Sequence, residues 1–145
     1  MFSKALLAAS ALVGYTLAQS CPEASRFGGV TYSPNPIVLG QEVTFTGNFA
    51  CAIELGYAPV FTDYFLEVPE SNNTGFQPPV YIARRGPPPS GGIDTFTYTF
   101  DPEYSPFTTN PDAQYVIVVQ TTHAEGSTLV TGSTSSGASI VQASD

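Results

Sequence analysis

Short runs of β-branched and aromatic residues, separated by proline, glycine, asparagine and serine, make up most of this 145-residue chain. In "EVTFTGNF", Val43, Phe45 and Phe49 fall on one side of an extended chain, while Thr44 and Thr46 fall on the other. Such alternation predicts strands with one buried and one solvated face, and helical periodicity is essentially absent. The chain is therefore expected to be all-β.

Turn residues recur every ten or so residues, which is typical of an immunoglobulin-like or fibronectin-III-like antiparallel β-sandwich of about seven strands. Pro34 and Pro36 donate no backbone hydrogen bond, so the first strand is expected to be split, to lie at an edge and to change sheet. The expected strands cover residues 30–32 with 37–39, 43–49, 59–68, 80–84, 93–101, 113–121, and 128–131 continued by 139–141.

The amino terminus has the pattern of a secretory signal peptide. Lys4 is followed by the short apolar run "ALLAASALVGYTLA", with small residues at Thr16 and Ala18. The run is too short to span a membrane, which favours a signal peptide over a membrane anchor. We therefore expect residues 1–18 to be removed by cleavage after Ala18. Residues 19–145 then form a single exported domain, extracellular or associated with a cell wall.

Charge and cysteine content narrow the function. Without Lys4, three arginines face twelve carboxylates, a net charge of −9 that disfavours binding to nucleic acid or to anionic membranes. In an exported chain, Cys21 and Cys51 most simply form one disulfide, with two free thiols or an intermolecular bridge as alternatives. Closing this loop is expected to stabilise the fold by about 3–4 kcal/mol.

Catalytic chemistry has little support in the sequence. His123 is the only histidine, no Gly-x-Ser-x-Gly motif accompanies it, and we expect it to be exposed at a hairpin turn. Asp63 and Glu67 share a strand face at about 13 Å, too far apart for a glycosidase pair. Asp101-Pro102-Glu103 is better explained as a solvated turn than as a calcium ligand set. We expect no enzyme, cofactor or metal site.

Several residues are candidates for other roles. Tyr57, Tyr81 and Tyr104 lie near loops and could stack on sugar rings. Asn72 begins the only glycosylation sequon, Asn-Asn-Thr. Arg84-Arg85 is a possible dibasic processing site, although two arginines paired with surface acids are the favoured interpretation.

Two stretches, "VYIARRGPPPSGGIDTFTYTF" and "QYVIVVQTTHAEGSTLVTGSTSSGASI", suggest a family. Their order resembles the immunoglobulin-like amino-terminal domain of fungal Ser/Thr-rich, yeast cell-wall-synthesis-related secreted proteins, with Phe45 and Phe96 where that family often has tryptophan. This resemblance implies a non-catalytic module that binds wall polysaccharide or an extracellular protein.

The opening "SPNPIVLGQEVTFTG" also resembles the ML lipid-recognition sandwich, a family with more cysteines than the two found here. This alternative implies a lipid carrier whose sheets are splayed around an apolar pocket. Val43, Phe45, Phe96 and Ile117 would line that pocket.

Overall fold

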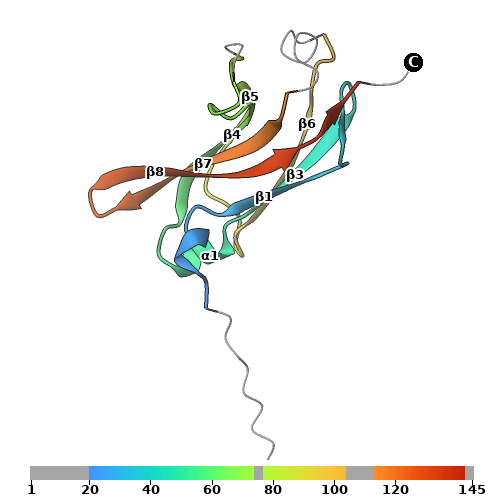
Figure 1. Ribbon diagram of the computed structural model, residues 1–145. Coiled ribbons are helices and arrows are strands. Elements are labelled where there is room, and N and C mark those ends of the chain that lie inside the picture. Colours follow the sequence, from blue (N-terminus) through green and yellow to red (C-terminus); the bar gives the residue numbers. More distant parts are fainter. Residues whose placement is uncertain (1–19, 74–76, 104–112, 143–145) are drawn as a thin grey trace, which may run out of the picture.

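The computed structural model describes residues 20–73, 77–103 and 113–142 (Figure 1). The predicted signal peptide, residues 1–18, lies outside these ranges. In chain order the elements are a 3-10 helix η1 (Glu23–Ser25), β1 (Gly29–Ser33), β2 (Ile37–Val38), β3 (Glu42–Asn48), α1 (Ala50–Glu54), β4 (Pro59–Glu67), β5 (Val80–Arg85), β6 (Ile93–Thr99), β7 (Tyr115–Glu125), β8 (Thr128–Ala138) and β9 (Ile140–Val141).

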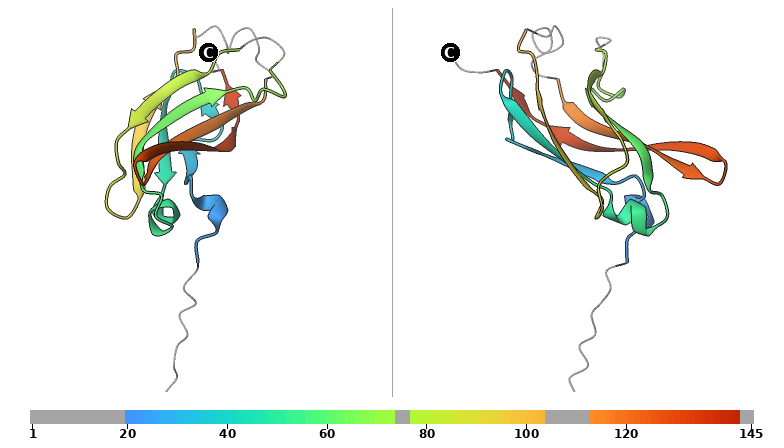
Figure 2. Two further views of the ribbon diagram at one scale, coloured as in Figure 1. Left: turned by 90° about the vertical axis from the view of Figure 1, so that its left-hand side faces the viewer. Right: turned by 180° about the vertical axis from the view of Figure 1, so that it is seen from behind.

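Two antiparallel sheets pack on one another, as the two views of Figure 2 show. The smaller sheet has the strand order β1-β3-β6 and the larger β5-β4-β7-β8. A short parallel pair, β2-β9, joins them at one side. The predicted all-β sandwich is confirmed.

The first strand changes sheet, as the sequence predicted. β1 pairs with β3 in the smaller sheet, whereas β2 pairs with β9, which follows directly after β8 of the larger sheet. The Pro34–Pro36 segment lies between β1 and β2 and is exposed. The prolines have no N–H to donate, but in an exposed segment the neighbouring carbonyl groups can bond to water instead.

Two strands and one helix differ most from the sequence prediction. β7 continues to Glu125, four residues beyond the expected end at Thr121, and β8 is continuous from Thr128 to Ala138. The Gly/Ser-rich part of β8 has weak strand propensity, but its in-register pairing with β7 holds it extended. The five-residue helix α1 was not expected, because it is too short to show helical periodicity.

The core lies between the sheets and is rich in aromatic side chains. Phe45 stacks on Phe96 with a ring-centroid distance of 5.4 Å and meets Phe100 edge-on at 6.3 Å. Tyr64 crosses the interior from the larger sheet to meet Phe96 at 4.8 Å. The other buried apolar side chains are Val30, Ile37, Leu39, Val43, Phe49, Ala52, Leu66, Val68, Val80, Ile82, Tyr115, Ile117 and Val119.

The predicted disulfide is confirmed. Cys21 and Cys51 are bonded with their Cα atoms 5.3 Å apart, which ties the segment before β1 to α1. Among the residues that the structure describes, no helix is long and apolar enough to cross a membrane.

Candidate functional site

The larger sheet has one face turned away from the core, which we call the outer face. Its side chains alternate with the buried ones along each strand, and the strand register places them in rows across the sheet. The outer face consists of Phe61, Asp63, Phe65 and Glu67 on β4, Tyr81 and Arg84 on β5, Val116, Val118 and Gln120 on β7, and Thr131, Ser133 and Ser135 on β8.

Two aromatic rings meet on the outer face between the edge strand β5 and its neighbour β4. Tyr81 lies opposite Phe65 in the register, and their rings form an edge contact at 5.6 Å. Val118 lies opposite Phe65 on the other side. Tyr81 is 51% exposed, among the more exposed large side chains of the described residues. The row is therefore an apolar strip open to solvent.

A fixed arginine extends this strip. Arg84 donates from Nε to Asp63 Oδ1 and from Nη2 to Asp63 Oδ2, each at 2.7 Å, and these hydrogen bonds are the main reason that the pKa of Arg84 is raised. Its guanidinium lies 4.4 Å from the centroid of the Phe61 ring. The Asp63 side chain is only 5% exposed and that of Arg84 is 60% exposed, so the pair presents a planar cation to solvent.

A groove runs along one side of the outer face. One hollow, about 270 Å³ in volume, is lined by Glu67, Glu70, Val118 and residues 133–135 of β8. A larger hollow of about 560 Å³ lies at the end of the sandwich, where its lining includes Tyr32, Asn35 and Gln114. Both hollows are also lined by Pro69 and Val116, so they adjoin and form one extended depression.

Arg85, the next residue along the chain, does not belong to the outer face. It donates from Nε and Nη2 to the two carboxylate oxygens of Asp94, both at 2.9 Å, and lies 5.2 Å from the ring centroid of Phe96. Asp94 is on β6, so this ion pair connects the two sheets. The hydrogen bonds to Asp94 raise the pKa of Arg85. Arg85 thus has a structural role.

The structure separates the predicted tyrosines. Tyr81 lies on the outer face, whereas Tyr57 is half-buried and packs edge-on against His123 at 5.0 Å. Tyr104 lies outside the described residues. Of the two that the structure describes, Tyr81 is the one whose side chain is exposed on the outer face.

The remaining predicted sites are the glycosylation sequon and the dibasic pair. Asn72 is exposed, and its Nδ2 donates to Gln114 Oε1 at 3.4 Å. The threonine of its sequon lies outside the described residues. Arg84 and Arg85 both form ion pairs, but their partners, Asp63 and Asp94, are buried carboxylates rather than surface acids.

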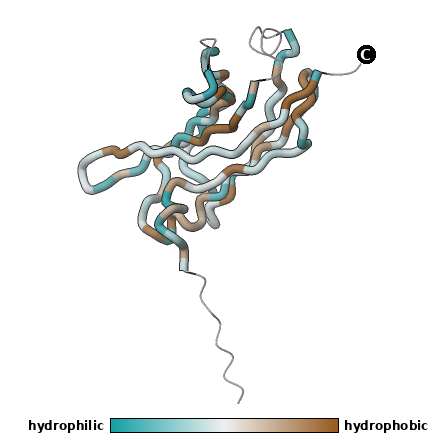
Figure 3. Tube along the Cα trace, in the orientation of Figure 1, coloured by the Kyte–Doolittle hydropathy of each residue, from teal (hydrophilic) through white to brown (hydrophobic). Residues whose placement is uncertain are grey.

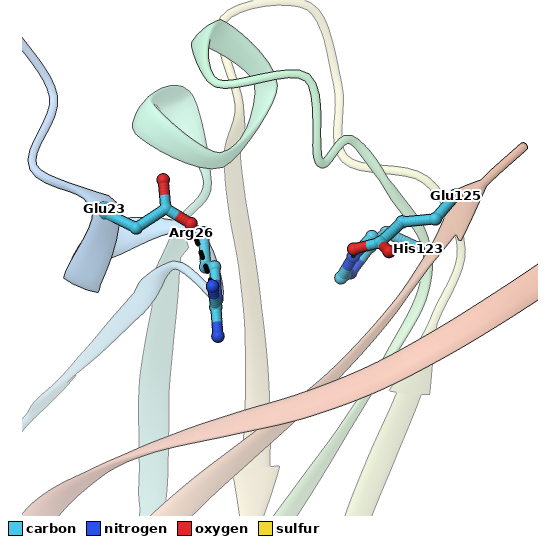
Figure 4. A network of polar contacts seen from close by, with 4 residues as sticks. All are labelled: Glu23, Arg26, His123 and Glu125. Carbon is cyan, nitrogen blue, oxygen red and sulfur yellow. Dashed lines mark hydrogen bonds and ion pairs between the residues drawn. The ribbon is translucent and has the colours of Figure 1, made fainter.

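The expectation that His123 is exposed at a turn is wrong. His123 lies within β7 and is 1% exposed, between the rings of Phe27 at 6.1 Å and Tyr57 at 5.0 Å. Its Nε2 is 3.1 Å from Glu125 Oε1. Figure 4 shows the two side chains next to each other. The turn begins beyond Glu125, because β7 is longer than expected. His123 is covered by the segment that the disulfide anchors.

Sequence reasoning missed Phe61 and Phe65 as surface aromatics. An aromatic residue in an alternating strand is usually assigned to the core, and both faces of β4 carry large apolar side chains. The signal that could have identified them is Asp63. It lies two residues from each, so all three side chains are on the same face of the strand, and an acidic residue marks that face as the solvated one. No known protein-family model matches the chain, and neither does any curated protein sequence.

Proposed function

We propose that this protein is a secreted, non-catalytic module that binds polysaccharide through the outer face of its larger sheet. The observation that carries the proposal is the exposed Tyr81, set edge-on against Phe65 in a row that ends at Val118, a lining residue of the groove. The apolar faces of sugar rings stack on aromatic side chains, and a long depression suits a polymer better than a single sugar.

Polar groups of the outer face suit the edges of a sugar chain. Gln120 lies opposite Asp63 on one side and Ser133 on the other, and Ser135 lies opposite Val118. Their amide and hydroxyl groups both donate and accept hydrogen bonds, as sugar hydroxyls do. The planar Arg84 cation adds a donor whose position is fixed by Asp63.

The experiment is a pull-down of the mature chain on insoluble glucan, chitin and whole cell walls. Wild type is expected in the pellet with at least one of these polymers. Tyr81→Ala should weaken retention about fivefold, since an aromatic stacking contact is worth roughly 1 kcal/mol. Ile93→Ala is the matched control, because Ile93 is 45% exposed but lies on the smaller sheet.

Retention that Tyr81→Ala and Ile93→Ala change equally would contradict the outer face as the site. A wild type that stays in the supernatant with all three materials would contradict polysaccharide binding itself. Binding to an extracellular protein would then be the hypothesis to test.

The lipid-carrier alternative stays a prediction that no observation favours. Val43, Phe45 and Ile117 are fully buried, and Phe45 is stacked directly on Phe96. These side chains contact one another where the alternative would require them to surround a ligand.

A further inference from the structure

The strand β8 forms one edge of the larger sheet and has an unusual composition for an edge. Its sequence is "TLVTGSTSSGA", with no charged residue and no proline. Edge strands of soluble proteins ordinarily carry lysine, proline or a bulge that prevents another strand from pairing with them. In Figure 3 much of β8 is pale, and the β7-β8 hairpin extends beyond the rest of the sandwich.

Part of this edge is already occupied. Ser139 O accepts a hydrogen bond from Ile37 N at 2.8 Å, and Gly137 O accepts one from the Tyr32 hydroxyl at 3.1 Å. These carbonyls point away from β7. Because alternate residues of a strand direct their backbone groups to the same side, Leu129, Thr131, Ser133 and Ser135 face the same way.

No described residue outside β8 forms a backbone hydrogen bond with those four residues on that side. The open stretch therefore runs from Leu129 to Ser135 and ends where Tyr32 covers Gly137. It is symmetric about Gly132: Thr131 and Ser133 are equally distant from it, and so are Leu129 and Ser135.

We propose that this stretch is the dimer interface of the protein, with β8 pairing antiparallel to β8 of a second copy around a twofold axis at Gly132. In this register Thr131 pairs with Ser133 of the other copy, and Leu129 pairs with Ser135. All four open residues are then used, with about eight hydrogen bonds, because each such pair exchanges two.

Charge makes this edge the place where a second copy can approach. The mature chain carries a net charge of −9, so two copies repel each other over most of their surfaces. β8 contributes no charge, which makes it a place where two chains can approach without like charges opposite one another. Gly132 itself, at the axis, is packed against the Phe27 ring of its own chain, where a side chain would collide with that ring.

The opposite edge of the sheet is protected in the usual ways. β5 carries a bulge opposite Tyr64 and Phe65, ends in Arg84 and Arg85, and is followed within a few residues by three consecutive prolines. A dimer through β8 is therefore closed: it joins two larger sheets into one and leaves only the two protected β5 edges. Both outer faces lie on the same side of the joined sheet.

The test is sedimentation velocity of the mature chain over a concentration series up to about 100 μM. Wild type should shift from monomer to dimer as concentration rises. Ser133→Pro removes an N–H that points to the open edge and bonds nothing in the monomer, so it should raise the dimer dissociation constant at least about tenfold. Far-UV circular dichroism and the urea midpoint show whether each variant is folded.

Two variants that each introduce a carboxylate supply a matched comparison. Ser133→Glu places two carboxylates beside the axis and should also give monomer, whereas Gln120→Glu makes a similar change on the same face of the central strand β7 and should leave the dimer intact. A wild type that is monomeric throughout the series overturns the proposal, and so does a folded Ser133→Pro that dimerises like wild type.

Discussion

Arg84 and Arg85 are neighbours in the chain, and each forms a two-bond ion pair with a buried aspartate while lying over a phenylalanine ring. Arg84 does this on the outer face of the larger sheet, within β5 and β4. Arg85 does it toward the interior, between the two sheets. The same chemistry at consecutive positions therefore serves two purposes.

The difference follows from the strand period. Successive side chains point to opposite faces, so a dibasic pair on a strand is divided between a solvated and a buried surface. The inward member connects the sheets and contributes to stability. The outward member holds a cation in place on the surface where we propose that a ligand binds.

The largest expected effect compares two consecutive residues of β7. Ile117 is fully buried on the inner side, so Ile117→Ala should lower the free energy of unfolding by about 3–4 kcal/mol. Val118 lies on the outer face, and Val118→Ala should cost less than about 1 kcal/mol. Urea unfolding followed by circular dichroism measures both. Equal losses would mean that the outer face is covered rather than open.

The arginine pair gives the next effect. Removing one partner of a fully buried ion pair costs about 3–5 kcal/mol, but the Arg85 side chain is 40% exposed. We therefore expect Arg85→Gln to lower the free energy of unfolding by about 2 kcal/mol. Arg84→Gln should shift the urea midpoint less and weaken retention on the polysaccharide. If Arg84→Gln is the more destabilising variant, the division between the faces is wrong.

The sequence predicts those parts of the fold that are determined by local residue patterns, and not those determined by pairing with another strand. Alternation in β3 and β6, and the prolines between β1 and β2, are local signals, and they predicted both the strands and the change of sheet. The continuity of β8 was not predictable in that way. Its Gly/Ser-rich segment is extended because β7 pairs with it along its whole length.

The site was less accessible to sequence reasoning than the fold. Tyr81 could be selected because it lies near a loop, but Phe61 and Phe65 look like core residues until the register shows which face they occupy. His123 illustrates the opposite error. A polar residue near a turn was expected in solvent, yet Phe27 and Tyr57, remote in the sequence, cover it.

A smaller effect should appear at alkaline pH. Burial, with Asp94 as a second cause, raises the pKa of Tyr64 well above its ordinary value of 10, and burial also raises that of Tyr115. The folded state then holds these protons more tightly than the unfolded state does. Their contribution is fully present below pH 10 and is lost as pH rises above it, by up to about 1.4 kcal/mol per pH unit for each group.

Urea midpoints measured between pH 8 and pH 11 test this expectation. The midpoint should be flat up to about pH 9.5 and fall beyond it, and Tyr64→Phe should fall less steeply than wild type. Identical slopes for Tyr64→Phe and wild type would show that another group causes the alkaline loss.

The smallest expected effect is that of Tyr64→Phe at neutral pH. The Tyr64 hydroxyl is buried against Gly47 and has no hydrogen-bond partner among the described residues, so removing it leaves nothing newly unpaired. The free energy of unfolding should stay within about 1 kcal/mol of wild type, on the favourable side. Tyr115→Phe is the control, since the Tyr115 hydroxyl donates to Gln77 Oε1 at 3.2 Å. That variant should lose about 1 kcal/mol, and an equal loss in Tyr64→Phe would mean that its hydroxyl is bonded in solution.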